Sequence, residues 1–514
     1  MSRQTGFLGI DIGTSGAKVL VVGDDGQVLG STTIAYELDI PRPGWAEQDP
    51  EQWARATKQA VRTVCAAVSG VDIRAIGLTG QMHGLVLLDE RGHVLRPAIL
   101  WCDGRTTEQC RDITHRIGAE RLIQLTCNPA LEGFTAPKLL WVRDHEPEIF
   151  QRTKTVLLPK DYVRYVLTGE RATEVSDASG TLLFDVRRRR WSEEMLAALE
   201  VPASFLPQVY ESPEITGVLR REVARELGLP AGIPVVGGGG DQAAGAVGTG
   251  IVEPGLVSAT IGSSGVVFAH SADVLLDPQG RVHTFCHAVP GAWHVMGVTQ
   301  GAGLSLRWWR DHFGDTETTV ARRLGIDPYA LLIEEAAQAP AGSEGLIWLP
   351  YLMGERTPHL DALARGVLFG ISGHHTRAHV LRAVLEGVVY SLRDSIEILR
   401  EMKVPLSIVR VSGGGARSAL WRQIQADTYQ MPVCAMQVEE GPSFGAALLG
   451  AVGAGRFASV SEGCRGWVRF QPPQEPRSSY IPQYEEGYRL YQRLYPALRA
   501  LFPLAVALSD PRAL

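Results

Sequence analysis

Cysteine is scarce in this sequence of 514 residues. It has seven cysteines, an odd number, and no two have the C-x-x-C spacing of a zinc ribbon or redox motif. Disulfide-rich scaffolds usually carry even numbers of cysteines at regular spacings. The sequence therefore excludes a disulfide or zinc-ribbon framework, and we expect reduced thiols.

Long hydrophobic runs are missing as well. The first apolar run, Phe7–Ile10, is too short for the hydrophobic part of a secretion signal. The longest stretch without Asp, Glu, Lys or Arg is Val282–Leu306, and it contains three histidines, four glycines and a proline. A bilayer helix needs about 20 mostly apolar residues, so we expect a cytoplasmic protein without membrane contact.

An excess of positive charge is also absent. The 50 Lys and Arg residues face 56 Asp and Glu residues, which leaves a formal net charge of −6. Proteins that bind nucleic acids contact the phosphate backbone through a surplus of basic side chains. We therefore expect small molecules, and no nucleic acid, as partners.

Glycine is abundant, with 56 residues of 514, where about 7% is usual. Glycine turns separate three strand-like runs at the start of the chain, and Asp49-Pro50 then opens an amphipathic helix. Further strands are predicted at 73–78 and 85–88. This order predicts a mixed α/β domain whose first three strands are residues 7–12, 18–22 and 28–36.

The strand–loop–strand pattern of the first domain recurs later in the chain. Ile12-Gly-Thr-Ser-Gly16 matches Ile261-Gly-Ser-Ser-Gly265, and each follows one apolar run and precedes another. We interpret this as two related domains; the alternative is two unrelated hairpins that share common turn residues. After the second copy the pattern predicts a strand at 408–411 and helices at 302–313, 329–338, 379–402, 418–429, 445–453 and 485–501.

Two glycine segments place a carboxylate where a ligand can approach. In Gly9–Lys18 the loop N–H groups can bind an anion, Asp11 can hold Mg²⁺, and Lys18 either reaches a phosphate or is a solvated strand lysine. In Val235–Gly245 four consecutive glycines precede Asp241. Such a run costs conformational entropy that a plain turn does not require. Asp241 is therefore either a ligand-facing carboxylate or a simple helix N-cap.

A third glycine segment, Val409–Trp421, predicts a strand that enters a Gly₃ turn at a helix start. Such a turn can bind an anion or lie flat against a planar base. The sequence has no Gly-Lys dipeptide, so it contains no G-x-x-x-x-G-K-[ST] loop.

Together these segments resemble the superfamily of actin, sugar kinases and heat-shock ATPases, and more specific segments resemble the FGGY family of carbohydrate kinases. The latter are Gly133–His145, Tyr351–His359, Gly366–Ile371 and His379–Glu386. The resemblance implies two ribonuclease-H-like α/β domains around a central cleft. It places a sugar- and phosphate-binding domain at 1–250, a nucleotide-binding domain at 251–455, and an extension packed on the second domain at 456–514.

Within the family, three segments resemble the members that phosphorylate xylulose: Gly80–Gly84, Trp101–Arg105 and Leu158–Tyr162. The implied activity is ATP- and Mg²⁺-dependent conversion of D-xylulose to D-xylulose 5-phosphate, by which xylose enters the pentose phosphate pathway. Ribulose, glycerol or an acyclic signalling sugar are alternative substrates, and a homodimer is left open. A nucleotide-switched binding protein of the actin or heat-shock type is disfavoured because the segment after residue 455 is short.

The resemblance also assigns roles to individual residues. It implies that Asp241 is the general base and that Asp11 lies beside Mg²⁺, with both as metal ligands. The implied sugar contacts are Met82, His83, Trp101, Asp241 and Gln242. The implied nucleotide and phosphate contacts are Thr14, Ser15, Lys18, Gly262, Ser263, Gly303, Gly414, Gly415 and Ser418.

Some of these positions have a second interpretation or depart from the family pattern. Many xylulose-phosphorylating members have Asn where this chain has Gln242, and the second phosphate loop has Ser263-Ser264 where Thr begins the pair. The Met82-His83 pair argues against glycerol as the substrate. His83 can instead be a structurally satisfied histidine, and Trp101 can instead be a core residue.

Overall fold

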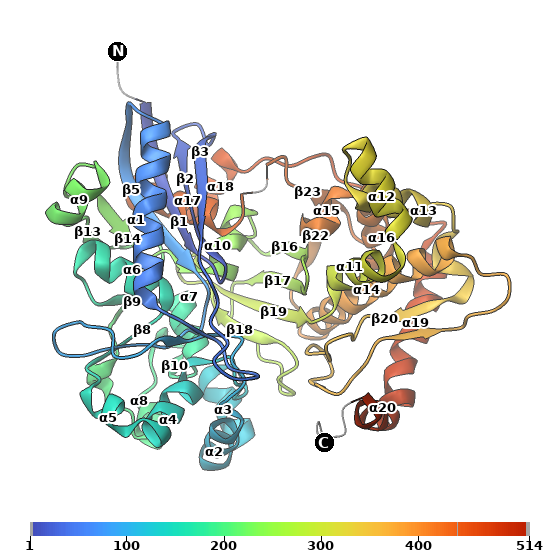
Figure 1. The fold of residues 1–514 in the computed structure, drawn as a ribbon, viewed down its shortest axis with the longest axis horizontal. Coiled ribbons are helices and arrows are strands. Elements are labelled where there is room, and N and C mark those ends of the chain that lie inside the picture. Colours follow the sequence, from blue (N-terminus) through green and yellow to red (C-terminus); the bar gives the residue numbers. More distant parts are fainter. Residues whose placement is uncertain (1–3, 439, 510–514) are drawn as a thin grey trace.

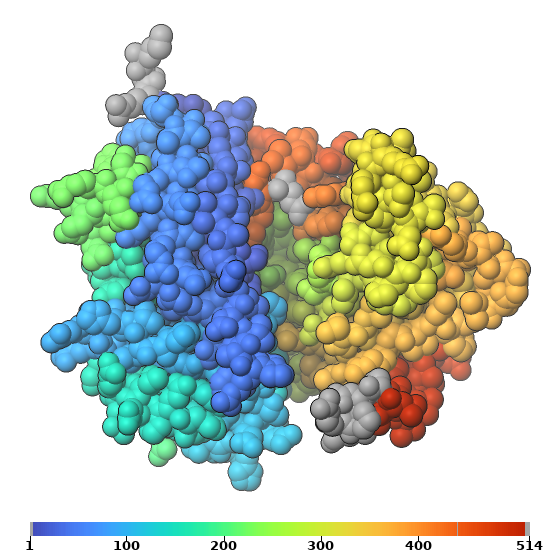
Figure 2. Space-filling view, in the orientation of Figure 1, coloured from blue at the N-terminus to red at the C-terminus, as the bar shows by residue number. Residues whose placement is uncertain are grey.

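The computed structural model describes residues 4–438 and 440–509 and consists of two lobes, each built on one large mixed sheet (Figure 1). The first sheet has the order β13-β14-β5-β1-β2-β3, with β15 paired to β5. The second has the order β18-β19-β17-β16-β22-β23. The space-filling view is hollowed between the lobes (Figure 2), as the two-domain prediction requires.

The first sheet begins with the predicted meander. β1 (Gln4–Ile12) pairs antiparallel with β2 (Gly16–Gly23), which pairs with β3 (Val28–Ala35). β5 (Val71–Gly80) runs parallel to β1 and to the short strands β14 (Pro234–Val236) and β15 (Gly239–Gly240). β13 (Ile215–Val218) closes the edge.

The second sheet repeats the arrangement of the first. β16 (Gly255–Ile261) pairs antiparallel with β17 (Gly265–Ser271) and parallel with β22 (Leu406–Gly413), as β1 does with β2 and β5. The duplication predicted from the two glycine loops is therefore confirmed. β19 (Trp293–Thr299), β18 (His283–Cys286) and β23 (Val433–Ala435) complete the sheet.

The predicted helices are present with small shifts of their ends. α1 (Pro50–Ala67) starts after Asp49, whose side chain accepts the N–H of Glu51, so Asp49-Pro50 was a correct start signal. In the second lobe the predicted helices are α11 (Ala302–Phe313), α13 (Pro328–Ala336), α14 (Arg377–Glu401), α16 (Ala419–Tyr429), α17 (Pro442–Gly453) and α19 (Ile481–Leu498).

Two helices of small residues pack against each other on the first sheet. α10 (Asp241–Gly248) packs against α17, and α17 also lies on β1 and β5 of the first sheet. A Cβ on Gly445 would lie 1.8 Å from the carbonyl oxygen of Ala244, and one on Gly77 would lie 1.8 Å from that of Ala446. Glycine is therefore required at both positions for the helices and sheet to approach this closely.

The extension after residue 455, which we expected to pack on the second domain, contacts both lobes. In α18 (Val460–Trp467) the ring of Trp467 lies 5.6 Å from that of Phe7 in β1. α19 packs on the second lobe, where the Tyr488 hydroxyl donates to Asp394 of α14 at 2.6 Å. The apolar face of α18 follows α17 onto the first sheet, which sequence position alone does not reveal.

Two other expectations can be compared with the structure. All seven cysteines, each in the described part of the chain, are free. Among the described residues, no helix combines the length and the hydrophobicity that crossing a membrane requires.

Candidate active site

The carboxyl ends of three parallel strands bring two acidic residues together. Asp11 of β1 is in register with Thr79 of β5, and Thr79 is in register with Gly239 of β15. Asp241 follows β15 directly as the first residue of α10. Ligands of α/β folds bind beyond the carboxyl ends of the strands, so both carboxylates lie where a substrate is expected.

The two carboxyl groups have raised pKa values. Burial, together with the charge of Asp241, raises the pKa of Asp11 to about 7, and Lys18 offsets part of this rise. Burial raises the pKa of Asp241 to about 6, against hydrogen bonds from Gln242. A carboxylate with a pKa near 6 is deprotonated at neutral pH and is still basic enough to accept a proton.

The alternative that Asp241 is a simple N-cap is wrong. Gly240 occupies the cap position of α10, and no side chain caps this helix end. The carboxylate instead accepts hydrogen bonds from the backbone N–H and the side chain of Gln242, the next residue.

His83 is placed next to the glycine loop by a backbone bend. It has a φ of 67°, and its Nδ1 lies 2.7 Å from the carbonyl oxygen of Gly180. Because a carbonyl only accepts, Nδ1 carries the hydrogen, and Nε2 keeps a lone pair. Burial and the nearby Lys138 lower the pKa of His83 to about 3, so the ring is neutral. His83 is therefore satisfied at one nitrogen and can accept a hydroxyl hydrogen at the other.

Met82 and Lys138 hold this part of the site in place. Met82 is buried against Gly240, where an added Cβ would lie 2.9 Å from its Cγ. Lys138 Nζ donates to the backbone carbonyls of His83 at 3.0 Å and Gly133 at 2.7 Å. The sequence placed Lys138 in a family signature but did not reveal that it supports His83.

Trp101 and Thr14 form the rim of the first glycine loop. Trp101 is 44% exposed, so the core interpretation of this residue is wrong. Its indole N–H donates to Thr14 Oγ1 at 3.0 Å, and Thr14 donates to Gln81 at 3.1 Å. The Thr14 hydroxyl is thus engaged within the protein, whereas the neighbouring Ser15 side chain is exposed at the loop tip.

Lys18 lies beside Asp11 in the β1–β2 register. Its Nζ is 2.7 Å from a carboxylate oxygen of Glu440, which precedes α17. Lys18 is therefore not a freely solvated strand lysine, and it links the first loop to the segment that joins the lobes.

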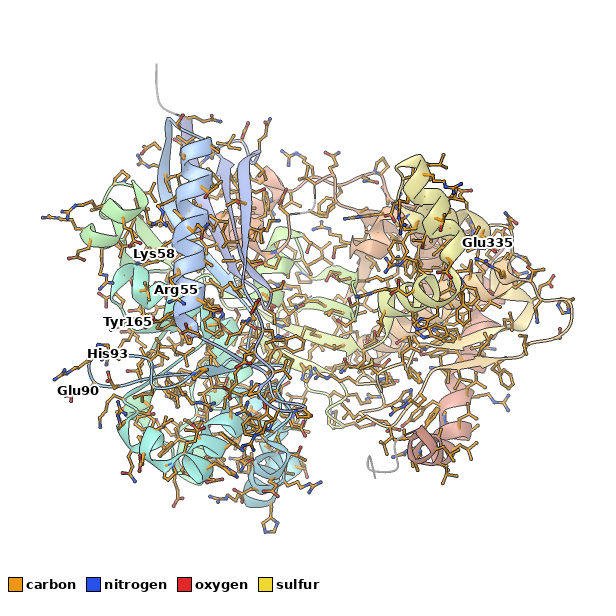
Figure 3. The ribbon with its side chains drawn as sticks, in the orientation of Figure 1. Arg55, Lys58, Glu90, His93, Tyr165 and Glu335 are labelled. Atoms are coloured by element: carbon orange, nitrogen blue, oxygen red, sulfur yellow. The ribbon has the colours of Figure 1, made fainter. Side chains whose placement is uncertain are left out.

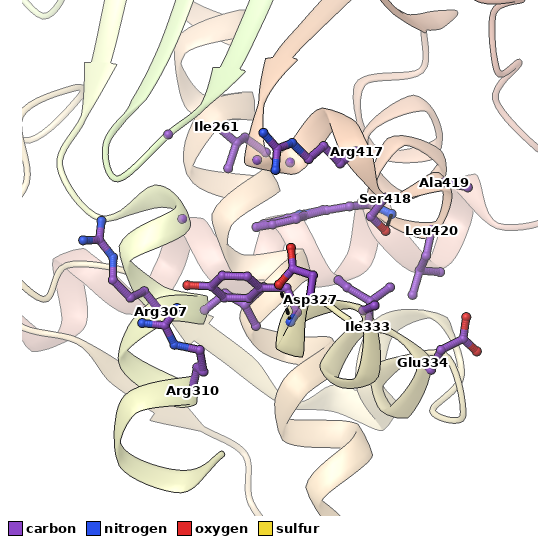
Figure 4. A pocket seen from close by; sticks show the side chains of 18 of the residues that line it. Ile261, Arg307, Arg310, Asp327, Ile333, Glu334, Arg417, Ser418, Ala419 and Leu420 are labelled. Atoms are coloured by element: carbon purple, nitrogen blue, oxygen red, sulfur yellow. Dashed lines mark hydrogen bonds between the residues drawn. The ribbon is translucent and has the colours of Figure 1, made fainter. Parts of the chain in front are cut away.

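A pocket of about 760 Å³ in the second lobe contains six of the nine predicted nucleotide residues. Figure 4 shows it between α11, α13 and the start of α16. Thr14 and Ser15, on the loop between β1 and β2, and Lys18, on β2, do not line it. The six that do are Gly262, Ser263, Gly303, Gly414, Gly415 and Ser418.

Close backbone contacts shape the end of this pocket that lies at the loop after β16. Gly303 N donates to the carbonyl oxygen of Gly262 at 2.8 Å, and a Cβ on Gly303 would lie 2.4 Å from that oxygen. At the other end of the pocket, Ser418 caps α16 by accepting the N–H of Trp421 at 3.1 Å. Glycine is thus required at position 303, where the loop after β16 meets the start of α11.

Arg307 is a pocket residue that the sequence interpretation missed. It extends from α11 toward the loop after β16 (Figure 4), where it donates to Ser263 Oγ. Within the described residues it forms no ion pair. Residues four apart share one face of a helix, so the spacing from Gly303 could have identified it.

A histidine cluster outside the cleft does not present an arranged metal site. Glu344, His374 and His375 each bring a ligand atom within 4.8 Å of the others. However, Nδ1 of His375 and Nδ1 of His379 accept backbone N–H groups. In the neutral rings Nε2 then carries the hydrogen, and in His379 this atom lies 3.4 Å from Glu344. We interpret the cluster as hydrogen bonding at the start of α14.

A basic groove on the first lobe is also not a phosphate site. Arg55 and Lys58 project from the side of α1 turned away from the second lobe (Figure 3). Lys58 pairs with Glu226 at 2.7 Å and Arg55 with Asp49 at 3.1 Å. Carboxylates of the protein already compensate these cations.

Comparison with known proteins agrees with this arrangement. The N-terminal and C-terminal domains of the FGGY family of carbohydrate kinases match residues 7–248 and 257–454. The chain is 43% identical to a xylulose kinase of Escherichia coli, over 96% of this chain and 100% of that protein. It is 41% identical to one of Bacillus subtilis, over 95% and 96%. The crystal structure of a xylulose kinase from Rhodospirillum rubrum superimposes with a TM-score of 0.89 at 31% identity, covering 97% of this chain and 99% of that one.

Proposed function

The chain belongs to the FGGY family of carbohydrate kinases, and we propose that it transfers the γ-phosphoryl group of ATP to D-xylulose, forming D-xylulose 5-phosphate and ADP. The observation that carries this proposal is the Asp241 carboxylate, with a pKa of about 6, at the strand ends and directly after Gly240, which packs against Met82. The full-length similarity to two xylulose kinases supports the choice of sugar.

Asp241 acts as the general base in this proposal. It accepts the hydrogen of the attacking sugar hydroxyl as the oxygen forms a bond to the γ-phosphorus. The bond between that phosphorus and the β–γ bridging oxygen breaks, and ADP leaves. His83 Nε2 accepts from another sugar hydroxyl, and the exposed ring of Trp101 forms the rim above the sugar.

The nucleotide lies in the pocket of the second lobe. Its volume of about 760 Å³ falls in the range of small-molecule sites. Gly414, Gly415 and Ser418 border the base, and Gly262, Ser263 and Gly303 border the phosphates. Arg307 contributes a positive charge without a carboxylate partner at the phosphate end, where charge-assisted hydrogen bonds are strong.

The residues of the site also suit Mg²⁺. The charge of Asp241 raises the pKa of Asp11, so a cation beside the two carboxyl groups would stabilise their ionised forms. Mg²⁺ prefers one or two carboxylates together with phosphate oxygens. When bound, the ion would offset the negative charge of the phosphates. Asp11 and Asp241 are the residues that would hold it.

The test is phosphorylation assayed by ADP release with Asp241→Asn. Loss of the base should lower kcat at least about 100-fold, while ATP binding and the melting temperature change little. In the unaltered enzyme kcat/KM should fall as the pH drops below about 6, where Asp241 becomes protonated. Near-normal turnover by Asp241→Asn would contradict the proposal.

The sugar is tested with a panel of xylulose, ribulose, ribitol, arabitol and glycerol. We expect the highest kcat/KM for xylulose. A higher kcat/KM for another compound of the panel would identify that compound as the preferred substrate and would not affect the role of Asp241.

A further inference from the structure

Five charged side chains are completely buried beneath the glycine loop that precedes Asp241. They come from α6 (Pro159–Thr168), β9 (Ala172–Glu174) and α7 (Val175–Ala178). Burying a charge costs desolvation free energy unless the charge is paired. Apolar residues in place of a buried ion pair often give a protein that is equally stable. Their presence here therefore needs another reason. The five are Lys160, Asp161, Arg164, Glu174 and Asp177.

The charges form one connected network. Lys160 Nζ lies 2.7 Å from Asp161, 3.0 Å from Asp177 and 3.4 Å from Glu174. Arg164 lies 2.6 Å from Asp161. The Glu174 carboxylate caps α7 by accepting the N–H groups of residues 176 and 177 at 2.7 and 2.9 Å.

Two hydrogen bonds connect this network to the ends of the glycine loop. Arg164 donates to the carbonyl oxygen of Gly237 at 2.9 Å. Ser176 Oγ accepts the N–H of Gly240 at 3.1 Å and donates to Glu174 at 2.9 Å. Four successive glycines have the greatest backbone freedom of any sequence, so these two anchors restrict the segment that carries Asp241.

The same short segment also anchors the sugar-contacting histidine. Gly180, in the turn that continues α7, accepts from His83 Nδ1 at 2.7 Å. A Cβ on Gly180 would lie 2.5 Å from His83 Cε1. Residues 176 and 180 thus fix the proposed base and the proposed sugar contact from one element.

The charges balance only if one carboxyl group holds a proton. Three acidic and two basic side chains are present. Asp161 lies beside both cations, and Glu174 accepts four hydrogen bonds from N–H and O–H groups. Asp177 contacts Lys160, and neither of its carboxyl oxygens accepts such a bond. Burial raises the pKa of Asp177 above its usual range. Asp177 is therefore the member of the network that can be neutral.

We propose that Ser176, Glu174 and the buried charges around them are positioning residues that hold Gly240, and through it the Asp241 carboxylate, in line with the sugar hydroxyl. This inference rests on the proposed role of Asp241. It assigns a kinetic function to residues that touch neither substrate, and it assigns Asp177 as the protonated member.

The direct test compares Ser176→Ala with Ser212→Ala. Both remove a hydroxyl bonded to the Glu174 carboxylate, since Ser212 Oγ donates to it at 3.0 Å, but only Ser176 bonds Gly240. Ser176→Ala should lower kcat at least about tenfold. Its KM values for xylulose and ATP should stay within about twofold of the unaltered enzyme. Ser176→Thr, which keeps the hydroxyl, should retain most of the original kcat. Ser212→Ala should leave kcat within about twofold.

Equal loss of kcat in the two alanine variants would overturn the inference, because the effect would then be general weakening of the network. Unchanged kcat in Ser176→Ala would also overturn it. Asp241→Asn measured in parallel separates the two proposals: if that variant is inactive while Ser176→Ala is normal, only the positioning inference fails.

The proton assignment is tested with Asp177→Asn and Asp161→Asn, with folding followed by circular dichroism. Asparagine mimics a protonated carboxyl group, so Asp177→Asn should retain at least about tenfold more kcat than Asp161→Asn. Equal losses in the two variants, or a greater loss in Asp177→Asn, would overturn the assignment.

Discussion

At the residue scale, several side chains of the site use one polar atom for a hydrogen bond within the protein. His83 donates from Nδ1 to Gly180 and keeps a lone pair on Nε2. Trp101 donates to Thr14 and leaves its ring exposed. Such partly satisfied side chains keep one orientation, and this preorganisation reduces the entropy lost when a sugar binds.

For His83→Ala we expect weaker xylulose binding. Loss of one or two buried hydrogen bonds corresponds to about 1–2 kcal/mol, or roughly a tenfold higher KM for xylulose, with the KM for ATP unchanged. Preference for xylulose over ribulose should fall too. Steady-state kinetics with each sugar measures this, and exposed His93→Ala is the control. Unchanged xylulose kinetics would show that His83 is structural.

For Arg307→Ala we expect weaker nucleotide binding. A charge-assisted hydrogen bond to a phosphate is worth about 1.5–3 kcal/mol, so the Kd for ATP should rise at least about tenfold, with little change for xylulose. Isothermal titration calorimetry measures both. The control is Arg323→Ala, an exposed arginine on α12 (Asp315–Leu324). If both variants bind ATP equally well, Arg307 does not contact the phosphates.

At the element scale, β18 and β19 carry buried histidines toward the first lobe. His294 of β19 stacks on Phe268 with ring centroids 4.1 Å apart. Burial, with the neighbouring His270 and His283, lowers the pKa of His294 to about 3. The folded protein therefore holds this ring neutral under conditions in which the unfolded chain protonates it.

This predicts a pH dependence of stability. Since the folded pKa lies below the unfolded value of 6.5, the contribution of His294 is complete above pH 6.5 and is lost as the pH falls toward 3. Each pH unit corresponds to about 1.4 kcal/mol. The free energy of unfolding of His294→Phe, relative to that of the unaltered chain, should therefore rise by about 2 kcal/mol when the pH is lowered from 7 to 5.

Urea unfolding at both pH values measures this change in the free energy of unfolding, and exposed His93→Phe is the control. A constant difference between His294→Phe and the unaltered chain at pH 7 and pH 5 would contradict the assignment of a neutral, buried His294.

At the scale of the whole molecule, the proposed sugar contacts lie on the first lobe and the nucleotide pocket on the second. Asp241 begins α10, which packs with α17 on the first sheet. Transfer requires both substrates to meet, so we expect the lobes to close when they bind. Lys18 and Glu440, 2.7 Å apart, connect the first loop to α17 on this path.

Closure predicts a smaller radius of gyration in solution scattering with saturating xylulose and a non-hydrolysable ATP analogue. The shift reflects the higher affinity of these ligands for the closed state. Glycerol at the same concentration is the control. An unchanged radius at saturation would contradict closure.

The sequence by itself determined the local elements and the repeated loop. Asp49-Pro50 marked the start of α1, and the match of Ile12–Gly16 to Ile261–Gly265 revealed the duplicated sheet, because capping and strand patterns depend on neighbouring residues. The glycine loops and signature segments also predicted Asp11, Asp241 and His83 as site residues, and the structure brings them to one edge of the first sheet.

Only the tertiary structure decided which distant residues complete that site. Ser176 bonds Gly240 across 64 residues, and Lys18 pairs with Glu440 across 422. Likewise, α18 packs on the first sheet although its sequence follows the second domain. These contacts depend on how helices and sheets pack in three dimensions, which no local pattern encodes, because the free energy of burial is gained only when the whole core assembles.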